Sequence, residues 1–187
     1  MQKILTFTFL SILTLFIMTT PNQAANGNYD PQNLLTIETK NGKILIELLP
    51  QVAPKHVERI KTLANRGFYD NVVFHRVIDG FMAQTGDPTG TGTGGSELPD
   101  LKAEFSDEPH IRGAVSMARA SSPNSANSQF FIVLKDSRFL DGQYTVFGRV
   151  IEGMGVVDKI KKGNGPNGMV GHPDAMLKVR VGNNTKK

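Results

Sequence analysis

The 187-residue sequence contains no cysteine and no tryptophan. The lack of cysteine excludes a disulfide bond, a cysteine metal ligand, a cysteine nucleophile and a lipid-modified cysteine after a leader segment. The lack of tryptophan excludes an indole N–H as a hydrogen-bond donor. The remaining composition, with 39% hydrophobic and 20% charged residues, is ordinary for a globular protein. A chain of this length predicts one domain with a sizeable core.

The sequence also lacks a strong charge of one sign. Its formal net charge is +4, and its basic residues are dispersed, apart from the lysine pairs at 161–162 and 186–187. A weak and scattered positive charge does not favour binding to a polyanion. We therefore expect no nucleic-acid partner.

Several common enzyme motifs are missing. No serine lies in a Gly-x-Ser-x-Gly elbow, and no Gly-Lys-Ser/Thr closes a phosphate-binding loop. Residues 90–95 formally match the glycine pattern of dinucleotide sites, but polar residues and Pro99 follow instead of an apolar helix. We interpret residues 87–109 as a flexible surface loop beside a groove. No two histidines are spaced at i, i+4, so we expect no metal site; the four are His56, His75, His110 and His172.

The N-terminus has the layout of a secretory signal peptide. Lys3 precedes an uncharged apolar run over residues 4–18, and residues 21–25 break this run and end in small side chains. The run is short for a transmembrane helix. We therefore predict a signal peptide over residues 1–25, cleaved near Ala24 or Ala25, with an uncleaved anchor as the alternative. The mature protein is expected to be exported without a stable membrane anchor, to the periplasm if the source has two membranes.

The rest of the chain is predicted to be mainly β. Residues 26–33 are interpreted as a flexible leader, residues 34–182 as the folded domain and residues 183–187 as a polar tail. Alternating apolar residues and turn signals predict many short strands, and three- and four-residue apolar spacing predicts a helix over residues 54–65. A second helix is expected over residues 156–162, followed by a loose loop over residues 163–171. Many short strands with two helices favour an antiparallel barrel.

One stretch, residues 74–87, mixes apolar and polar side chains in an unusual way. It is predicted to form two short strands joined at an Asp79-Gly80 turn. Arg76 and Gln84 would then stand over the same surface as Phe81 or Met82. A cation beside an apolar wall is costly in a core but useful in an open groove. The alternative is that Arg76 only forms a salt bridge. Alternation along the strand points His75 to the opposite face.

Several segments together resemble the signature segments of cyclophilins, which are peptidyl-prolyl cis/trans isomerases. They occur in the family's order: FHRVI (74–78), GFMAQ (80–84), TGG (93–95), SMA (116–118), SQFFI (128–132), FLDG (139–142) and VFG (146–148). The resemblance implies a mainly β fold, namely a closed eight-stranded antiparallel β-barrel capped by two α-helices. It implies a substrate groove on the outer face and no cofactor.

The resemblance also implies roles for individual residues. Arg76 matches the catalytic arginine, and Gln84 matches a side chain that contacts the peptide backbone. The wall of the proline pocket is implied for Phe81, Met82, Phe131 and Leu140, with Phe139 and Tyr144 beside it. Further substrate contacts are implied for Gly92, Ala118, Arg119, Ala120 and Gln129.

Three positions depart from the pattern of many eukaryotic members. Phe139 stands where they have tryptophan, Tyr144 where they have histidine, and Arg119 where they have asparagine. The loop over residues 120–127 is one residue longer. These features resemble the bacterial exported branch of the family. Without the indole donor, we expect only weak binding of cyclosporin A, and Arg119 is expected to alter the preference for residues around the proline.

The expected partners are proline-containing peptides and unfolded exported proteins, bound by a monomer. Two other functions are weighed against the isomerase. The first is a module of the same fold that binds proline-containing segments without turnover. The second is a small-ligand barrel of the lipocalin type, which is disfavoured because large apolar residues are expected to fill the barrel.

Overall fold

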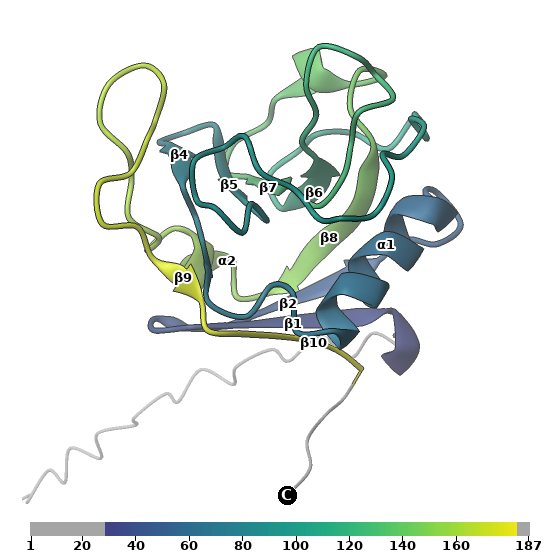
Figure 1. Cartoon of the computed structure of the whole chain (residues 1–187), viewed down its shortest axis with the longest axis horizontal. Helices are drawn as coiled ribbons and strands as arrows, with labels where there is room; N and C mark the ends of the chain where they lie inside the picture. The colour runs from purple at the N-terminus through teal and green to yellow at the C-terminus, as the bar shows by residue number, and fades with distance from the viewer. Residues whose placement is uncertain (1–28, 183–187) are drawn as a thin grey trace, which may run out of the picture.

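The structure is a computed structural model that describes residues 29–182, and eight of the ten strands in this range form one antiparallel sheet. Its strand order is β10-β1-β2-β8-β6-β7-β5-β4, while β3 and β9 form a separate pair. The strands are Leu34–Thr39 (β1), Gly42–Leu48 (β2), Val72–Val73 (β3), Arg76–Ile78 (β4), Met82–Thr85 (β5), Ala114–Met117 (β6), Phe130–Val133 (β7), Val146–Glu152 (β8), Ala175–Met176 (β9) and Lys178–Val181 (β10). Figure 1 shows the sheet curling from β10, β1 and β2 through β8 to the strands around β5.

The closed barrel that was expected is not confirmed. Strands β10 and β4 are the two ends of the hydrogen-bonded order, and within residues 29–182 no backbone pairing joins them. The small β3–β9 pair instead links the segments that lead into these two edges. The sheet is therefore a curled half-barrel rather than a closed one.

The longer helix, Pro54–Asn65 (α1), forms where the apolar spacing predicted it. Proline suits its first turn because the ring fixes φ and the missing N–H would have had no helical partner. Val57, Ile60 and Leu63 are buried along one face, which packs against β10 and β8. None of the helices within residues 29–182 is long and apolar enough to span a bilayer.

The second helix, Met154–Val157 (α2), is shorter than expected and begins two residues earlier. After it, the amides of Lys159 and Ile160 bond to carbonyls three residues back, which is the tighter pattern of a 3-10 turn. Val157 and Ile160 are both buried. The same apolar residues thus reach the core from a helix followed by a turn.

Two 3-10 helices complete the elements, Pro31–Asn33 (η1) and Arg138–Leu140 (η2). The Asp30 side chain caps η1 by accepting a hydrogen bond from the Gln32 amide at 2.9 Å. The last residues of the predicted flexible leader therefore have regular structure. The predicted signal peptide and the polar tail, residues 1–25 and 183–187, lie outside the described residues.

Strands β5, β6 and β7 separate two apolar clusters. Ala83, Val115 and Ile132 belong to the main core, which α1 covers. The neighbouring residues in each strand point to the other face, because side chains alternate along a strand. There Met82, Ala114, Phe131 and Val133 form a second, smaller cluster together with Leu140 of η2. This second cluster is the apolar foundation of the candidate site.

Candidate active site

A row of hydrogen-bonded side chains runs across β4 and β5 to the residue that precedes β7, on the outer face of the sheet. Arg76 on β4 lies opposite Gln84 on β5, and its Nη1 donates to Gln84 Oε1 at 3.2 Å. Gln84 Nε2 donates in turn to Gln129 Oε1 at 2.9 Å. Gln129 Nε2 then donates to the carbonyl oxygens of Gly92 and Gly94, at 3.1 and 2.8 Å. The row connects the predicted catalytic arginine to the glycine-rich loop.

Arg76 has no acidic partner among the described residues, so the salt-bridge alternative is not what the structure shows. Its Nε donates instead to the carbonyl oxygen of Asn167, at 2.9 Å. Both acceptors that hold the guanidinium are neutral. Its positive charge therefore remains available to a ligand. His75 is buried on the opposite face, as alternation predicted.

The glycine-rich loop is folded around a buried carboxylate rather than loose. Asp87 accepts hydrogen bonds from the amides of Thr89, Gly92 and Gly94 at 2.8, 2.6 and 3.1 Å. Burial alone would raise the pKa of Asp87, but the hydrogen bonds from Thr89, Gly94 and Gly92 outweigh it and lower the pKa to about 2. A single ionised side chain thus satisfies three amides of this loop and gives its first part a defined path.

The predicted wall of the proline pocket comes together as one apolar surface. Met82, Phe131 and Leu140 are buried in the second cluster, and Phe81 and Tyr144 pack against it. The ring of Phe131 lies 5.8 Å from that of Tyr144, centroid to centroid. Phe139 is 66% exposed, and its ring lies 5.6 Å from that of Phe81 at the edge of this surface.

The remaining predicted contacts line an adjacent groove of about 570 Å³. This lining includes Gln84, Gly92, Ala118, Arg119, Ala120 and Gln129. Ala118 also packs against the second cluster, so the groove and the apolar surface meet there. The thirteen residues that the resemblance implied thus lie on one continuous face, although their roles stay predictions.

Arg119 is fixed at the rim of the groove by carbonyl oxygens and an aromatic ring. Its Cζ lies 4.6 Å from the centre of the Tyr144 ring, a cation–π distance. Its Nη1 donates to the carbonyls of Ala120 and Ser121, and its Nε and Nη2 donate to that of Gln143. Like Arg76, it is held by neutral groups and keeps its charge for a ligand.

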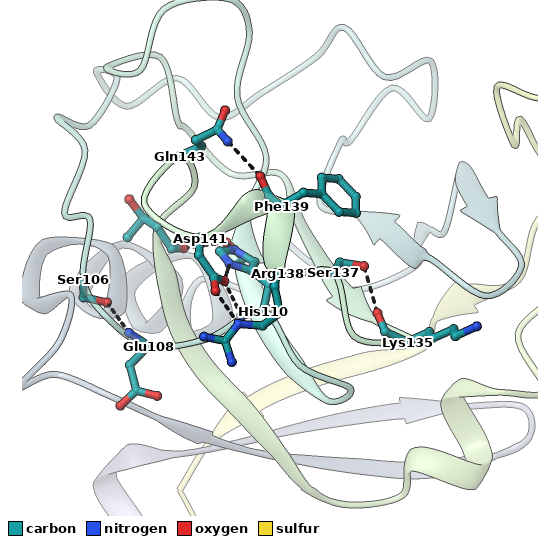
Figure 2. Close-up of polar contacts among 11 residues, drawn as sticks. Ser106, Glu108, His110, Lys135, Ser137, Arg138, Phe139, Asp141 and Gln143 are labelled. Carbon is teal, nitrogen blue, oxygen red and sulfur yellow. Dashed lines mark hydrogen bonds and ion pairs between the residues drawn. The ribbon is translucent and has the colours of Figure 1, made fainter.

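A buried histidine supports the apolar surface from beneath, and the sequence did not indicate it. The His110 ring stacks on Phe131 at 6.2 Å, between centroids. Its Nδ1 donates to Asp141 at 3.0 Å, as Figure 2 shows, and its Nε2 lies 3.0 Å from Ser116 Oγ. The single hydroxyl hydrogen of Ser116 has two acceptors within reach, His110 Nε2 and the Thr145 carbonyl oxygen at 2.9 Å.

The protonation states of His110 and Asp141 follow from their surroundings. Burial lowers the pKa of His110, although its hydrogen bond with Asp141 opposes that shift. The amide and ring of His110 and the side chain of Arg138 lower the pKa of Asp141 to about 2, against the effect of burial. His110 is therefore a neutral imidazole that bonds an ionised carboxylate. The only sequence signal was Asp141 in the segment over residues 139–142, which did not point to a partner 31 residues away.

Residues 29–182 contain no group of three histidine, aspartate or glutamate side chains placed to hold a metal ion. The site consists of a cationic donor, amide side chains and an apolar surface. Such a set can bind an extended peptide and stabilise a developing lone pair, but it holds no nucleophile.

Comparison with known proteins agrees with these features. Residues 34–181 match the family model described as cyclophilin type peptidyl-prolyl cis-trans isomerase/CLD. A probable peptidyl-prolyl cis-trans isomerase of Brucella suis biovar 1 is 53% identical over 169 residues, covering 84% of this chain and 86% of that protein. A peptidyl-prolyl cis-trans isomerase-like 1 protein of Aspergillus fumigatus is 46% identical over 130 residues, covering 67% of this chain and 80% of that protein.

Solved structures show the same similarity. The crystal structure of cyclophilin AquaCyp293 from Hirschia baltica matches with a TM-score of 0.74 and 31% identity, covering 82% of this chain and 75% of that one. A cyclophilin-type isomerase of Cryptosporidium parvum, crystallised in the presence of the dipeptide Ala-Pro, matches with a TM-score of 0.73 and 31% identity. That match covers 81% of this chain and 99% of the other.

Proposed function

The chain belongs to the family of cyclophilin-type peptidyl-prolyl cis-trans isomerases, and from this premise we propose that it isomerises Xaa-Pro bonds at Arg76 and so assists the folding of exported proteins. The observation that carries the proposal for the site is the guanidinium of Arg76, which two neutral acceptors hold beside an apolar surface.

The reaction needs no nucleophile, because its barrier is the loss of amide resonance, about 18–20 kcal/mol. When the bond twists, the prolyl nitrogen becomes pyramidal and regains a lone pair. An N–H that points at this nitrogen bonds more strongly in the twisted state than in either planar state, and only such a difference accelerates the reaction. Every 1.36 kcal/mol of that preference gives about a tenfold increase in rate.

Arg76 suits this task because its guanidinium stays charged and carries five N–H donors in a fixed plane. Two of them are used by Asn167 and Gln84. Nη2 donates to no residue within 29–182, so it is open to a substrate. Gln84 Oε1 keeps one lone pair for a peptide N–H of the substrate.

The apolar surface holds the proline ring while the rest of the peptide rotates. Met82, Phe131 and Leu140 have apolar side chains, so a proline ring packed on them excludes water. The lower local dielectric strengthens the contact between Arg76 and the prolyl nitrogen. Phe139 adds a ring without a donor, in line with weak binding of cyclosporin A.

Export is proposed from the sequence alone. The apolar run over residues 4–18 and the small residues before position 26 support a cleaved signal peptide and a periplasmic enzyme that acts on unfolded exported proteins. Proline isomerisation takes tens to hundreds of seconds without a catalyst, so such proteins have slow steps to accelerate.

An isomerisation assay with a proline-containing peptide tests the proposal, using residues 26–187 and their Arg76→Ala variant. A hydrogen bond to a charged group contributes about 1.5–3 kcal/mol, so kcat/KM should fall roughly 10- to 150-fold. Full activity of the variant would remove Arg76 from the mechanism. If Arg76→Ala fully restored a strain that lacks the gene, binding rather than turnover would be the cellular function.

A further inference from the structure

The segment over residues 163–170 does not behave as the loose loop that the sequence suggested. It lies along the free edge of β4, as Figure 1 shows, and three backbone hydrogen bonds fasten it there. The amide of Gly163 donates to the carbonyl of Val77 at 2.9 Å, and the amide of Val77 donates to the carbonyl of Gly168 at 2.7 Å. The amide of Val170 donates to the carbonyl of His75 at 3.0 Å.

Two glycines allow this close approach. A Cβ at Gly168 would overlap Ile78 Cγ1 and lie 2.9 Å from the Val77 carbonyl oxygen. A Cβ at Gly163 would overlap the carbonyl oxygen of Gly168. Gly165, in the same segment, has open space at the corresponding position. The contact with β4 therefore depends on two glycines in particular.

We propose that residues 163–170 position Arg76 for catalysis, through the backbone carbonyl of Asn167. This inference rests on the isomerase function proposed above. The Asn167 oxygen accepts from Arg76 Nε on one side of the guanidinium, and Gln84 Oε1 accepts from Nη1. These two acceptors fix the plane of the Arg76 guanidinium. Because the guanidinium is planar, the direction of the Nη2 donors is then fixed as well.

A backbone carbonyl suits this role better than a carboxylate. It accepts a hydrogen bond and so fixes the orientation of the side chain, but it does not neutralise the charge of Arg76. A carboxylate at the same place would compete with the prolyl nitrogen for the guanidinium. Because the acceptor belongs to the main chain, the side chain of Asn167 is dispensable, and only the path of the segment matters.

The test compares two matched pairs of variants in the mature protein. Gly168→Ala and Gly165→Ala both place a Cβ at a left-handed residue, with φ of 66° and 71°, but only the former meets β4. Gly163→Ala and Gly171→Ala involve no left-handed residue, and again only the former meets a neighbour. The backbone strain is thus equal within each pair, and the two members differ only in whether the added Cβ meets a neighbour. If Gly168→Ala does not fold, the second pair still tests the proposal.

Two readouts are measured for each variant. The first is kcat and KM separately, and the second is the exchange rate of the Arg76 Nε–H with solvent, followed by ¹⁵N NMR. Gly168→Ala and Gly163→Ala should lower kcat about tenfold with little change in KM and should speed the exchange of this proton. Gly165→Ala and Gly171→Ala should stay within about twofold of the parent.

Unchanged kcat in both Gly168→Ala and Gly163→Ala would overturn the inference. So would a loss of kcat with the Nε–H still protected, or an equal loss in the control variants. If the parent protein itself had no isomerase activity, the proposed function would fail, and the exchange measurement would still decide whether the segment holds Arg76.

Discussion

Arg76 and Gln84 face each other across the β4–β5 pair, and the neutral amide oxygen of Gln84 accepts a hydrogen bond from the arginine at 3.2 Å. The neutrality of this partner is a functional feature. A carboxylate at position 84 would have nearly the same shape, but it would form an ion pair with the guanidinium. The amide orients Arg76 and leaves its charge for the substrate.

The variant Gln84→Glu tests this relationship. We expect kcat/KM to fall at least tenfold, because the introduced carboxylate would pair with Arg76 and would lack the N–H that now donates to Gln129. Peptide isomerisation at neutral pH measures the effect. Gln32→Glu, which adds the same charge at an exposed position, should leave kcat/KM unchanged. Equal activity of Gln84→Glu and the parent would show that the neutrality of this partner is irrelevant.

The sequence predicted the local structure around Arg76 well, because a hairpin and strand alternation follow from short local patterns. The Asp79-Gly80 turn signal predicted a hairpin with Arg76 and Gln84 over one surface, and the structure pairs them directly. Alternation predicted that His75 points to the other face. The sequence could not predict contacts between distant segments. His110 meets Asp141 only because β6, β7 and η2 bring them together, and neither residue has a periodic signal.

The errors on the fold have the same origin. Alternation along a strand indicates which of its faces is buried, but it does not indicate which strands pair. The sequence therefore could not show that β10 and β4 stay unpaired and leave the barrel open. Glycine-rich composition suggested mobility for residues 87–109 and 163–171. In the structure, the Asp87 carboxylate accepts hydrogen bonds from amides of the first segment. The second segment forms backbone hydrogen bonds with residues 75–77 at the edge of β4.

The role of Asp87 in the glycine-rich loop predicts a loss of both stability and substrate affinity in Asp87→Asn. The amide can accept fewer hydrogen bonds from Thr89, Gly92 and Gly94, so unfolding free energy should fall by about 1–3 kcal/mol. KM should rise, because the loop carbonyls that hold Gln129 lose their support. Urea unfolding and peptide kinetics measure these effects.

Asp79→Asn is the control for Asp87→Asn, since Asp79 is exposed in the β4–β5 turn. The effect of Asp87 should also depend on pH. Its folded pKa of about 2 lies below the ordinary value of 3.8, so its contribution is present above pH 3.8 and is lost as the pH falls towards 2. In this window the free energy of unfolding of the parent should fall by about 2 kcal/mol more than that of the Asn variant. Parallel acid profiles of the two proteins would contradict this account.

Three buried histidines predict a loss of stability in mild acid. Burial lowers the pKa values of His56, His75 and His110 below the ordinary 6.5. The unfolded chain therefore takes up protons first as the pH falls below 6.5, and stability declines with each one. The slope contributed by one histidine is at most about 1.4 kcal/mol per pH unit. Urea unfolding between pH 7 and pH 5 measures it.

His75 allows the sharpest test of this slope, because neither of its ring nitrogens has a hydrogen-bond partner among the described residues. Its charged neighbours act in opposite directions, since Asp87 raises the pKa of His75 and Arg76 lowers it, both less than burial does. His75→Leu should reduce the slope of unfolding free energy with pH by the contribution of about one proton. An unchanged slope in His75→Leu would mean that the folded and unfolded chains protonate His75 equally, which would contradict this account.

Arg119 predicts a preference for peptides with an acidic residue near the proline. Its guanidinium lies at the rim of the groove, stacked on Tyr144 and bonded only to carbonyl oxygens among residues 29–182, so its charge is not neutralised. An exposed charge pair contributes about 0.2–1 kcal/mol, so peptides with Glu should exceed peptides with Lys in kcat/KM by roughly 1.4- to 5-fold. Arg119→Gln should remove this ratio, and so should 0.5 M salt, because both remove the attraction between charges. Lys178→Gln, an equal change of charge on β10, should preserve it. A ratio that survived in Arg119→Gln would place the selectivity in another part of the groove.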